Sequence, residues 1–385
     1  MQYCKKCVIP ETSETNKFDN NGVCSVCRQI ELKQNKNWTK KKDELVKIIN
    51  NYRNKNQYDC IVPFSGGKDS TFTLWYLVTQ MKLKVLAVRY DHNFLRDKLN
   101  KNVERTLSKL SVDFISYKSN FEIVKKIMKE SLIRRGDFCW HCHVGISAFP
   151  INTACEKKIP LLFYGEPSAE YSSYYNYEDN EELNVEKFNK ISNLGIQAED
   201  MIEMLKERYP QETFDERDFK PFVFPSQRDL NKNKIKALYL GNYIPWDVKQ
   251  QVKIIKKNLG WQGDNVEGIP PEYNYEKIEC LLQGSRDYTK FLKRGFGRTS
   301  HLTSIDIRNE RKSRKDALEL VRKYDGKKPK SLDILLEILN LSEKEYHKII
   351  EKHVVFPNKM PANIIRESRN IFYKEFQNAI NKFKN

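Results

Sequence analysis

The feature that most constrains the fold is a glycine-rich segment, SGGKDS, at residues 65–70. The apolar run before it, residues 59–64, has the composition of a buried strand, and the run after it, residues 70–81, has helical spacing. A turn from a strand into a helix places unpaired backbone N–H groups and a partial positive charge at one point. The segment therefore predicts a phosphate-binding loop in an α/β domain.

The residues of this loop suit a phosphorylated nucleotide. Gly66 and Gly67 allow backbone angles and a close approach that a Cβ would prevent, and Lys68 offers positive charge to phosphate oxygens. Asp69 would repel phosphate unless a cation lay between them, so it predicts a nucleotide bound with Mg²⁺. We expect Ser65, Lys68 and Asp69 to be the catalytic residues of the loop.

Short apolar strands alternate with helical segments around this loop, a pattern typical of a parallel sheet with helices on both faces. The predicted strands span residues 59–64, 84–90, 112–117 and 160–165. The predicted helices span residues 70–81, 97–110, 121–134 and 144–157. The strand signal fades after residue 170, helical patterns follow, and a further helix is expected near residues 275–282.

These patterns predict three parts in the chain of 385 residues. Residues 1–35 form a small cysteine-rich, zinc-binding module, residues 36–180 form the α/β domain with the phosphate loop, and residues 181–385 form a mostly helical region that binds substrate or partner. A tyrosine-rich stretch at residues 168–177 is a candidate lid that would keep water from a reactive intermediate.

The overall composition favours a soluble enzyme. The chain is 39% hydrophobic, without an apolar run of the about 18 residues that a membrane span needs. Charged and cysteine residues at the N-terminus do not resemble a signal peptide, so we expect a cytoplasmic protein. The formal charge of +17 favours anionic partners, or reflects a general abundance of lysine and asparagine.

Four of the nine cysteines form two CxxC pairs, Cys4 with Cys7 and Cys24 with Cys27, separated by sixteen residues. An odd total without a signal sequence indicates reduced thiols and metal ligation, not disulfides. Four thiolates at this spacing predict a closed, structural Zn²⁺ site that folds a module too small to fold by burial alone. An iron–sulfur site and unligated thiols remain alternatives.

A third CxxC pair, Cys139 and Cys142, lies in the segment FCWHCHVGI, just before a predicted helix. With His143 it predicts a second metal site whose metal the sequence does not name. A distant thiol such as Cys280 is the other candidate to complete the ligands. A catalytic redox pair and a pair of buried thiols at a helix start remain open.

Basic and aromatic residues concentrate in the C-terminal region, between residues 286 and 321. Arg294, Arg298 and Arg308 are predicted to bind a phosphate or carboxylate of the substrate, because arginine binds such groups through two parallel hydrogen bonds. The alternative is a solvated basic face.

The segment SGGKDS resembles the pyrophosphate loop of the ATP-pyrophosphatase (PP-loop) superfamily. That resemblance implies an adenine nucleotide alpha-hydrolase-like (HUP) parallel sheet, cleavage of ATP between its α- and β-phosphates, and adenine over the strand ends. The residues that would bind ATP are Pro63, Phe64, Ser65, Gly66, Gly67, Lys68, Asp69, Ser70, Arg89, Gly165 and Glu166.

Nearly the whole chain resembles the N-acetyl sugar amidotransferase family. The resemblance rests on the ordered blocks YCKKCVIPET, GVCSVC, SGGKDS, CWHCHVGI, YGEPSAE, YLGNYIPWD and GFGRTSHLTSIDIRNERKSRKDALELVRKYDG. It implies that ATP activates the acetamido oxygen of a sugar or nonulosonic acid. Ammonia then replaces this oxygen to give an acetamidino group, AMP and pyrophosphate, for bacterial surface polysaccharide or flagellin glycans.

The source of ammonia is expected to be a separate protein. Position 2 is Gln2, so removal of the initiator methionine does not expose a cysteine nucleophile. The family resemblance implies separate glutaminase and ammonia-channelling subunits, similar to the two subunits of imidazole glycerol phosphate synthase.

A tRNA thiolase of the same superfamily is the main alternative function. Several thiolases carry an N-terminal cysteine knuckle, the same loop and a CxxC that helps to hold an iron–sulfur cluster, as Cys139 and Cys142 would. The charge of +17 suits a tRNA backbone. The basic residues are dispersed, however, and no RNA-binding domain is recognisable, so a nucleic-acid partner is not expected.

Overall fold

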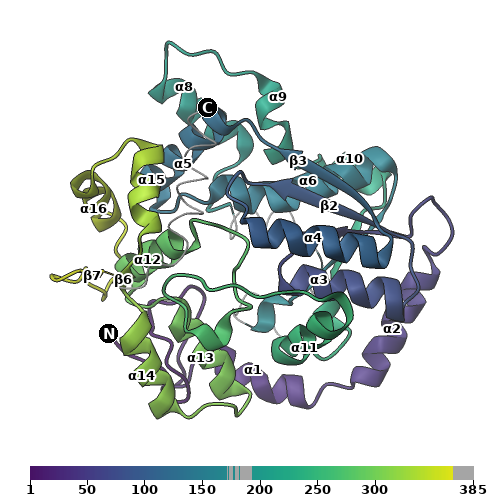
Figure 1. The fold of residues 1–385 in the computed structure, drawn as a ribbon, viewed down its shortest axis with the longest axis horizontal. Helices are drawn as coiled ribbons and strands as arrows, with labels where there is room; N and C mark the ends of the chain where they lie inside the picture. The colour runs from purple at the N-terminus through teal and green to yellow at the C-terminus, as the bar shows by residue number, and fades with distance from the viewer. Residues whose placement is uncertain (171, 173–176, 178–181, 183–192, 367–385) are drawn as a thin grey trace.

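The computed structural model describes residues 1–170, 172, 177, 182 and 193–366. Within these residues five parallel strands form one sheet in the order β3-β2-β1-β4-β5 (Figure 1). The strands are β1 (Cys60–Pro63), β2 (Val85–Asp91), β3 (Asp113–Lys118), β4 (Leu161–Tyr164) and β5 (Lys236–Tyr239). The predicted α/β class with a parallel sheet is confirmed.

Helices cover both faces of this sheet, as the alternation of side chains along β1 shows. Val62 belongs to a core cluster with Phe72 of α3 (Lys68–Trp75). Ile61, which points to the opposite face, belongs to a cluster with Ile151 of α6 (Trp140–Lys157). Each strand of the centre is therefore apolar on both faces, as parallel strands between two helical layers require.

The other helices surround these two layers or form the C-terminal region (Figure 1). They are α1 (Ser25–Gln34), α2 (Trp38–Asn50), α4 (Asp97–Leu110), α5 (Phe121–Arg135), α8 (Ala198–Arg208), α9 (Glu216–Phe219), α10 (Gln227–Lys232), α11 (Val248–Leu259), α12 (Gln283–Arg294), α13 (Arg298–Arg308), α14 (Arg314–Tyr324), α15 (Ser331–Leu339) and α16 (Glu343–Glu351). Two short strands, β6 (Lys327–Lys328) and β7 (Ile365–Arg366), pair with each other. None of the described helices is long and apolar enough to cross a membrane.

The four predicted strands and the helices between them are present, with small shifts of their ends. The helix expected over residues 70–81 begins at Lys68 and passes into a π-helical turn, Tyr76–Gln80. The helix expected from residue 144 begins at Trp140, so the CxxC segment lies in its first turn instead of before it.

Two expectations for the later part of the chain are wrong. The edge strand β5 (Lys236–Tyr239) was missed, because four residues of mixed polarity give little periodic signal. The helix expected near residues 275–282 is instead an irregular segment, in which the Leu281 N–H donates to the Phe94 carbonyl (2.9 Å). Ile278 packs in the core cluster of the sheet and Leu281 in a second cluster with α12, so the segment runs between two cores.

The N-terminal module packs against the C-terminal helices α13 and α14 (Figure 1). Arg314, the first residue of α14, donates from Nε to the Cys7 carbonyl (3.0 Å) and from Nη2 to the Cys4 carbonyl (3.3 Å). The Val8 N–H donates to Ser304 Oγ of α13 (3.4 Å). Segments about 300 positions apart in the sequence therefore pack against each other.

Candidate active site

The SGGKDS loop turns from β1 into α3 with a backbone that requires glycine. Gly66 has φ +87°, and a Cβ there would lie 2.4 Å from Val103 Cγ2. The Gly66 N–H donates to Ser70 Oγ (3.3 Å), and its carbonyl accepts from Trp261 Nε1 (3.0 Å). The predicted strand–loop–helix geometry is therefore present, and tertiary contacts fix it.

Lys68 lies at the start of α3 with 6% of its surface exposed. Its Nζ is 2.7 Å from Asp69 Oδ2 and 2.9 Å from Glu276 Oε2. Burial alone would lower the pKa of Lys68, but the surrounding carboxylates raise it well above its ordinary value. The cation is therefore permanent, and it is held at the mouth of the loop where a phosphate would bind.

Further carboxylates surround Lys68. Burial and the nearby Asp69 raise the pKa of Glu166 to about 8. Asp69 Oδ1 and Glu279 Oε2 are buried oxygens that have no hydrogen-bond partner among the described residues. Carboxylate oxygens with open coordination beside a phosphate loop are the donor set that Mg²⁺ prefers, so these residues fit the predicted ion.

Glu279 lies directly against the loop. A Cβ on Gly67 would come 1.8 Å from Glu279 Oε1. Gly67 has φ −71° and ψ 174°, an extended conformation open to any residue, so the glycine is required here by space and not by backbone angle. The carboxylate from the segment before α12 therefore covers one side of the loop.

The loop lies where the strand order of the sheet reverses. The chain leaves β1 towards β2 and later returns to β4 on the other side of β1, and ligands of open α/β sheets bind outside the strand ends at such a point. A cavity of about 1060 Å³ opens there. Among the predicted ATP-binding residues, it is lined by Pro63, Phe64, Ser65, Lys68, Asp69, Ser70, Arg89, Gly165 and Glu166. The two loop glycines, Gly66 and Gly67, are not among its described lining residues.

The three arginines predicted to bind substrate also line this cavity, but each has protein contacts. Arg294 Nε lies 2.8 Å from Glu14 Oε1 of the N-terminal module. Arg298 Nη2 lies 3.1 Å from Asp287 Oδ1, and Arg308 Nη2 donates to the carbonyl of residue 170 (2.9 Å). Their substrate role stays a prediction. Of the candidate lid, residues 171 and 173–176 lie outside the described part of the chain.

The four N-terminal cysteines converge as their spacing predicts. All four Sγ atoms lie within 4.8 Å of one another, with Cys4 and Cys27 4.0 Å apart and Cys7 and Cys24 3.8 Å apart. A tetrahedral zinc ion with Zn–S bonds of about 2.3 Å separates its sulfurs by about 3.8 Å. The cluster therefore fits a single ion better than an iron–sulfur cluster, whose thiolates bind different iron atoms.

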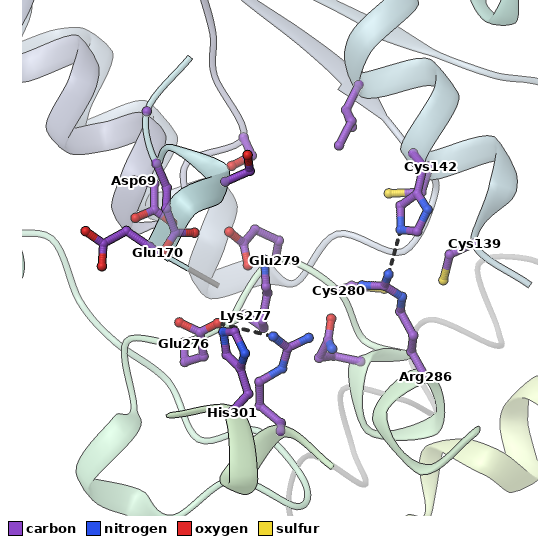
Figure 2. Close-up of a pocket in the computed structure, with 18 of the residues that line it drawn as sticks. Asp69, Cys139, Cys142, Glu170, Glu276, Lys277, Glu279, Cys280, Arg286 and His301 are labelled. Carbon is purple, nitrogen blue, oxygen red and sulfur yellow. Dashed lines mark hydrogen bonds and ion pairs between the residues drawn. The ribbon is translucent and has the colours of Figure 1, made fainter. Parts of the chain in front are cut away.

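The second predicted metal site has a different arrangement. Figure 2 shows Cys139, Cys142 and Cys280 at one end of the pocket, near Arg286. His143 Nε2 lies 2.7 Å from Arg286 Nη2, so the imidazole nitrogen faces a cation instead of the thiols. Burial raises the pKa of Cys142 to about 11 and of Cys280 to about 12. Within the described residues, only the N-terminal cysteines meet the spacing for a single ion, and the second site stays a prediction.

Several residues of the site were missed in the sequence. Glu276, Glu279 and Arg286 reach the cavity from a segment about 200 positions after the loop. No local pattern marks the two glutamates, and Arg286 is only the first residue of the basic stretch. Figure 2 shows Glu276 and Asp69 on one side of the pocket and Arg286 on the other.

Comparisons with known proteins link the C-terminal part to lipopolysaccharide (LPS) biosynthesis. Residues 272–385 match the family model described as "LPS biosynthesis protein WbpG-like, C-terminal domain". An uncharacterized protein of Methanocaldococcus jannaschii is 30% identical over 144 residues, which are 36% of this chain and 50% of that protein. The chain thus spans half the length of this relative.

Among solved structures, the chain aligns with the tRNA thiolase NcsA from Methanococcus maripaludis, determined with its 4Fe-4S cluster. The alignment covers 94% of this chain and 92% of the thiolase, at 12% identity and a TM-score of 0.30. This score is too low to establish a common fold.

Proposed function

We propose that this protein is an ATP-dependent amidotransferase that makes acetamidino sugars for a bacterial surface polysaccharide or flagellin glycan. The acetamido oxygen of the sugar attacks the α-phosphorus of ATP and pyrophosphate leaves. Ammonia adds to the activated carbon, AMP leaves with the oxygen, and loss of a proton gives the amidine. The reaction class is that of the PP-loop ATP pyrophosphatases.

The observation that carries the proposal is one continuous cavity with two kinds of wall. One wall is the SGGKDS loop at the switch point of the sheet. The other comes from the segment that matches an LPS biosynthesis family, through residues of α12 and α13. A volume of about 1060 Å³ exceeds what one small ligand needs, so ATP and a sugar fit together.

The described residues divide the chemical tasks. Lys68 and the loop N–H groups stabilise the charge that develops on the departing pyrophosphate. Asp69 and Glu279 would bind Mg²⁺ together with phosphate oxygens of ATP, and the ion would shield the phosphates from these carboxylates and stabilise the same charge. Glu276 would hold Lys68 in position through their ion pair. Glu166, with its pKa raised to about 8, would accept a proton from the ammonia adduct at mildly alkaline pH. The N-terminal Zn²⁺ would support one wall of the cavity without taking part in the reaction.

Ammonia is proposed to come from separate glutaminase and channelling subunits. The purified chain should then use ammonium and not glutamine. Incubation with ATP, Mg²⁺, ammonium and candidate acetamido sugars should give AMP, pyrophosphate and a modified sugar. Mass spectrometry should show that this sugar has a lower mass than the substrate, because NH has replaced an oxygen atom. Lys68→Gln should abolish this, whereas Lys344→Gln, exposed on α16, should not. Formation of ADP and orthophosphate would contradict the proposal.

A second candidate, a tRNA thiolase, is favoured by one observation. Three thiols, Cys139, Cys142 and Cys280, line the same cavity as the loop. Three thiolates would suit a cluster with one iron open to sulfur. The test is the iron and sulfide content of protein purified without oxygen, in wild type and in Cys280→Ser. Iron that this substitution removes, together with bound tRNA, would favour the thiolase.

A further inference from the structure

Helix α12 presents a row of basic side chains to the cavity. Arg286, Lys290 and Lys293 are spaced by four and three residues, so they lie on one face of the helix. All three line the cavity. We call them the basic row. Arg135, at the end of α5, and Arg294 add two further cations to the same part of the wall.

The contacts of the basic row are mostly with uncharged groups. Arg286 Nη2 lies 2.7 Å from His143 Nε2, and because arginine only donates, this nitrogen of the imidazole accepts and the ring is neutral. Lys293 Nζ donates to a backbone carbonyl at 3.5 Å. Lys290 Nζ lies 4.5 Å from the centre of the Phe296 ring. None of these contacts cancels a positive charge.

Carboxylates cancel only part of the charge. Glu14 lies 3.5 Å from Lys290 Nζ but also 2.8 Å from Arg294 Nε, so one carboxylate serves two cations. Asp137 lines the same part of the wall, and Asp287 also acts on Arg286 and Lys290. Asp287 is shared as well, because it lies 3.1 Å from Arg298 Nη2. Burial, together with neighbouring cations, lowers the pKa of Lys290 and of Lys293. An anion in the cavity would relieve this repulsion.

The basic row is separate from the site for the phosphates of ATP. Figure 2 shows Arg286 on the opposite side of the pocket from Asp69 of the loop. The loop has its own cation, Lys68, held by carboxylates at 2.7 and 2.9 Å. An anion at the row therefore belongs to a second ligand.

We propose that the basic row binds an anionic group, a carboxylate or a phosphate, on the sugar substrate. Arg286, Lys290 and Lys293 hold this group at the α12 side of the cavity, and the rest of the sugar extends towards the loop. Neutral acetamido sugars are then poor substrates. The inference deepens the proposed function and rests on it for the identity of the ligand as an acetamido sugar.

Binding measurements on the full-length chain test this inference without turnover. Two pairs of probes are used, and within each pair the two compounds differ mainly in one charged group. The first is N-acetylglucosamine 1-phosphate with N-acetylglucosamine, and the second is N-acetylneuraminic acid with its methyl ester. Titration calorimetry compares wild type with two double variants. One carries Lys290→Gln and Lys293→Gln, and the other carries Lys290→Arg and Lys293→Arg. Lys344→Gln is the matched control, and ATP binding by every variant checks that the fold is kept.

In at least one pair, the charged probe should bind wild type about 10- to 100-fold more tightly than its neutral partner. The pair that shows the difference identifies the group as phosphate or carboxylate. The glutamine variant should lose the difference, and the arginine and Lys344 variants should keep it. Equal binding within both pairs, or a preference that survives in the glutamine variant, would overturn the inference. If wild type prefers the charged probe but the incubation with ATP, Mg²⁺, ammonium and acetamido sugars yields no AMP, the proposed function is refuted. The assignment of the basic row as an anion site would then still stand.

Discussion

The two glycines of the loop are required for different reasons, Gly66 by its backbone angle and Gly67 by the side chain beside it. Alanine substitutions distinguish these two reasons. At Gly66, φ is +87°, where alanine costs roughly 1–2 kcal/mol of backbone strain. The new methyl group would also lie 2.4 Å from Val103 Cγ2, and overpacking of this kind costs roughly 1–3 kcal/mol. We therefore expect Gly66→Ala to lower the free energy of unfolding by roughly 2–5 kcal/mol.

Gly67→Ala should behave differently. Its φ of −71° suits alanine, and the loss of a flexible glycine in the unfolded chain favours folding by about 0.4–1 kcal/mol. The three atoms nearest to the new methyl group all belong to the Glu279 side chain, the closest at 1.8 Å, and that side chain can rotate away. Stability should change little, but Glu279 should leave the loop, so Gly67→Ala should alter the affinity for Mg²⁺-ATP as Glu279→Ala does.

Urea unfolding and ATP titration of both single variants and of two double variants test this argument. When Val103→Ala is added to Gly66→Ala, the double variant should regain the part of the unfolding free energy lost to overpacking, but not the part lost to backbone strain. Glu279→Ala with Gly67→Ala should bind ATP as Glu279→Ala alone does. Equal stability of the two glycine variants, or additive effects of the Gly67 and Glu279 substitutions on ATP binding, would refute the reasoning.

Three further predictions concern charge and metal. Because the pKa of Glu166 is raised to about 8, wild type should lose stability relative to Glu166→Gln as pH rises from about 5 to 8, by at most about 1.4 kcal/mol per pH unit. Although burial opposes it, Lys68 lowers the pKa of Glu276 to about 2, so wild type should lose stability relative to Glu276→Gln as pH falls from about 4.5 towards 2. Melting temperatures across pH check both, and a flat difference between wild type and variant would contradict either. Cys24→Ser should remove zinc and expose residues 1–35 to protease, whereas Cys155→Ser should change neither; elemental analysis showing zinc retained in Cys24→Ser would contradict the site.

The parts of the fold that the sequence predicts are those with local signals. Two adjacent glycines between a strand and a helix mark the phosphate loop, and short apolar runs that alternate with helical segments mark β1 to β4. The four N-terminal cysteines converge because their spacing already brings each pair together. In these cases the residues that determine the structure lie in one short segment or, for the cysteines, in two short motifs.

The parts that the sequence does not predict depend on contacts between distant segments. Tyr275, Ile278 and Leu281 have a helical spacing, yet the first two pack in the core of the sheet and Leu281 packs in the core with α12. The Leu281 N–H donates to the Phe94 carbonyl instead of to a helical partner. Such a choice is made by tertiary packing, which overrides local periodicity. From this irregular segment Glu276 reaches Lys68, with 2.9 Å between Oε2 and Nζ.

The same dependence explains why a cysteine-rich module lies beside the cavity that we propose binds a sugar. Residues 1–35 are too few to bury a core, so their position is set by the four thiols and by the α13–α14 surface to which Arg314 attaches them. From that position Glu14 reaches Lys290 and Arg294 of α12. Without the module, the basic row would gain an unpaired charge and lose the wall that faces it, while the loop around Lys68 would keep all its contacts. A metal ion held by the four thiols would thus support one half of the cavity, and its loss should weaken sugar binding more than ATP binding.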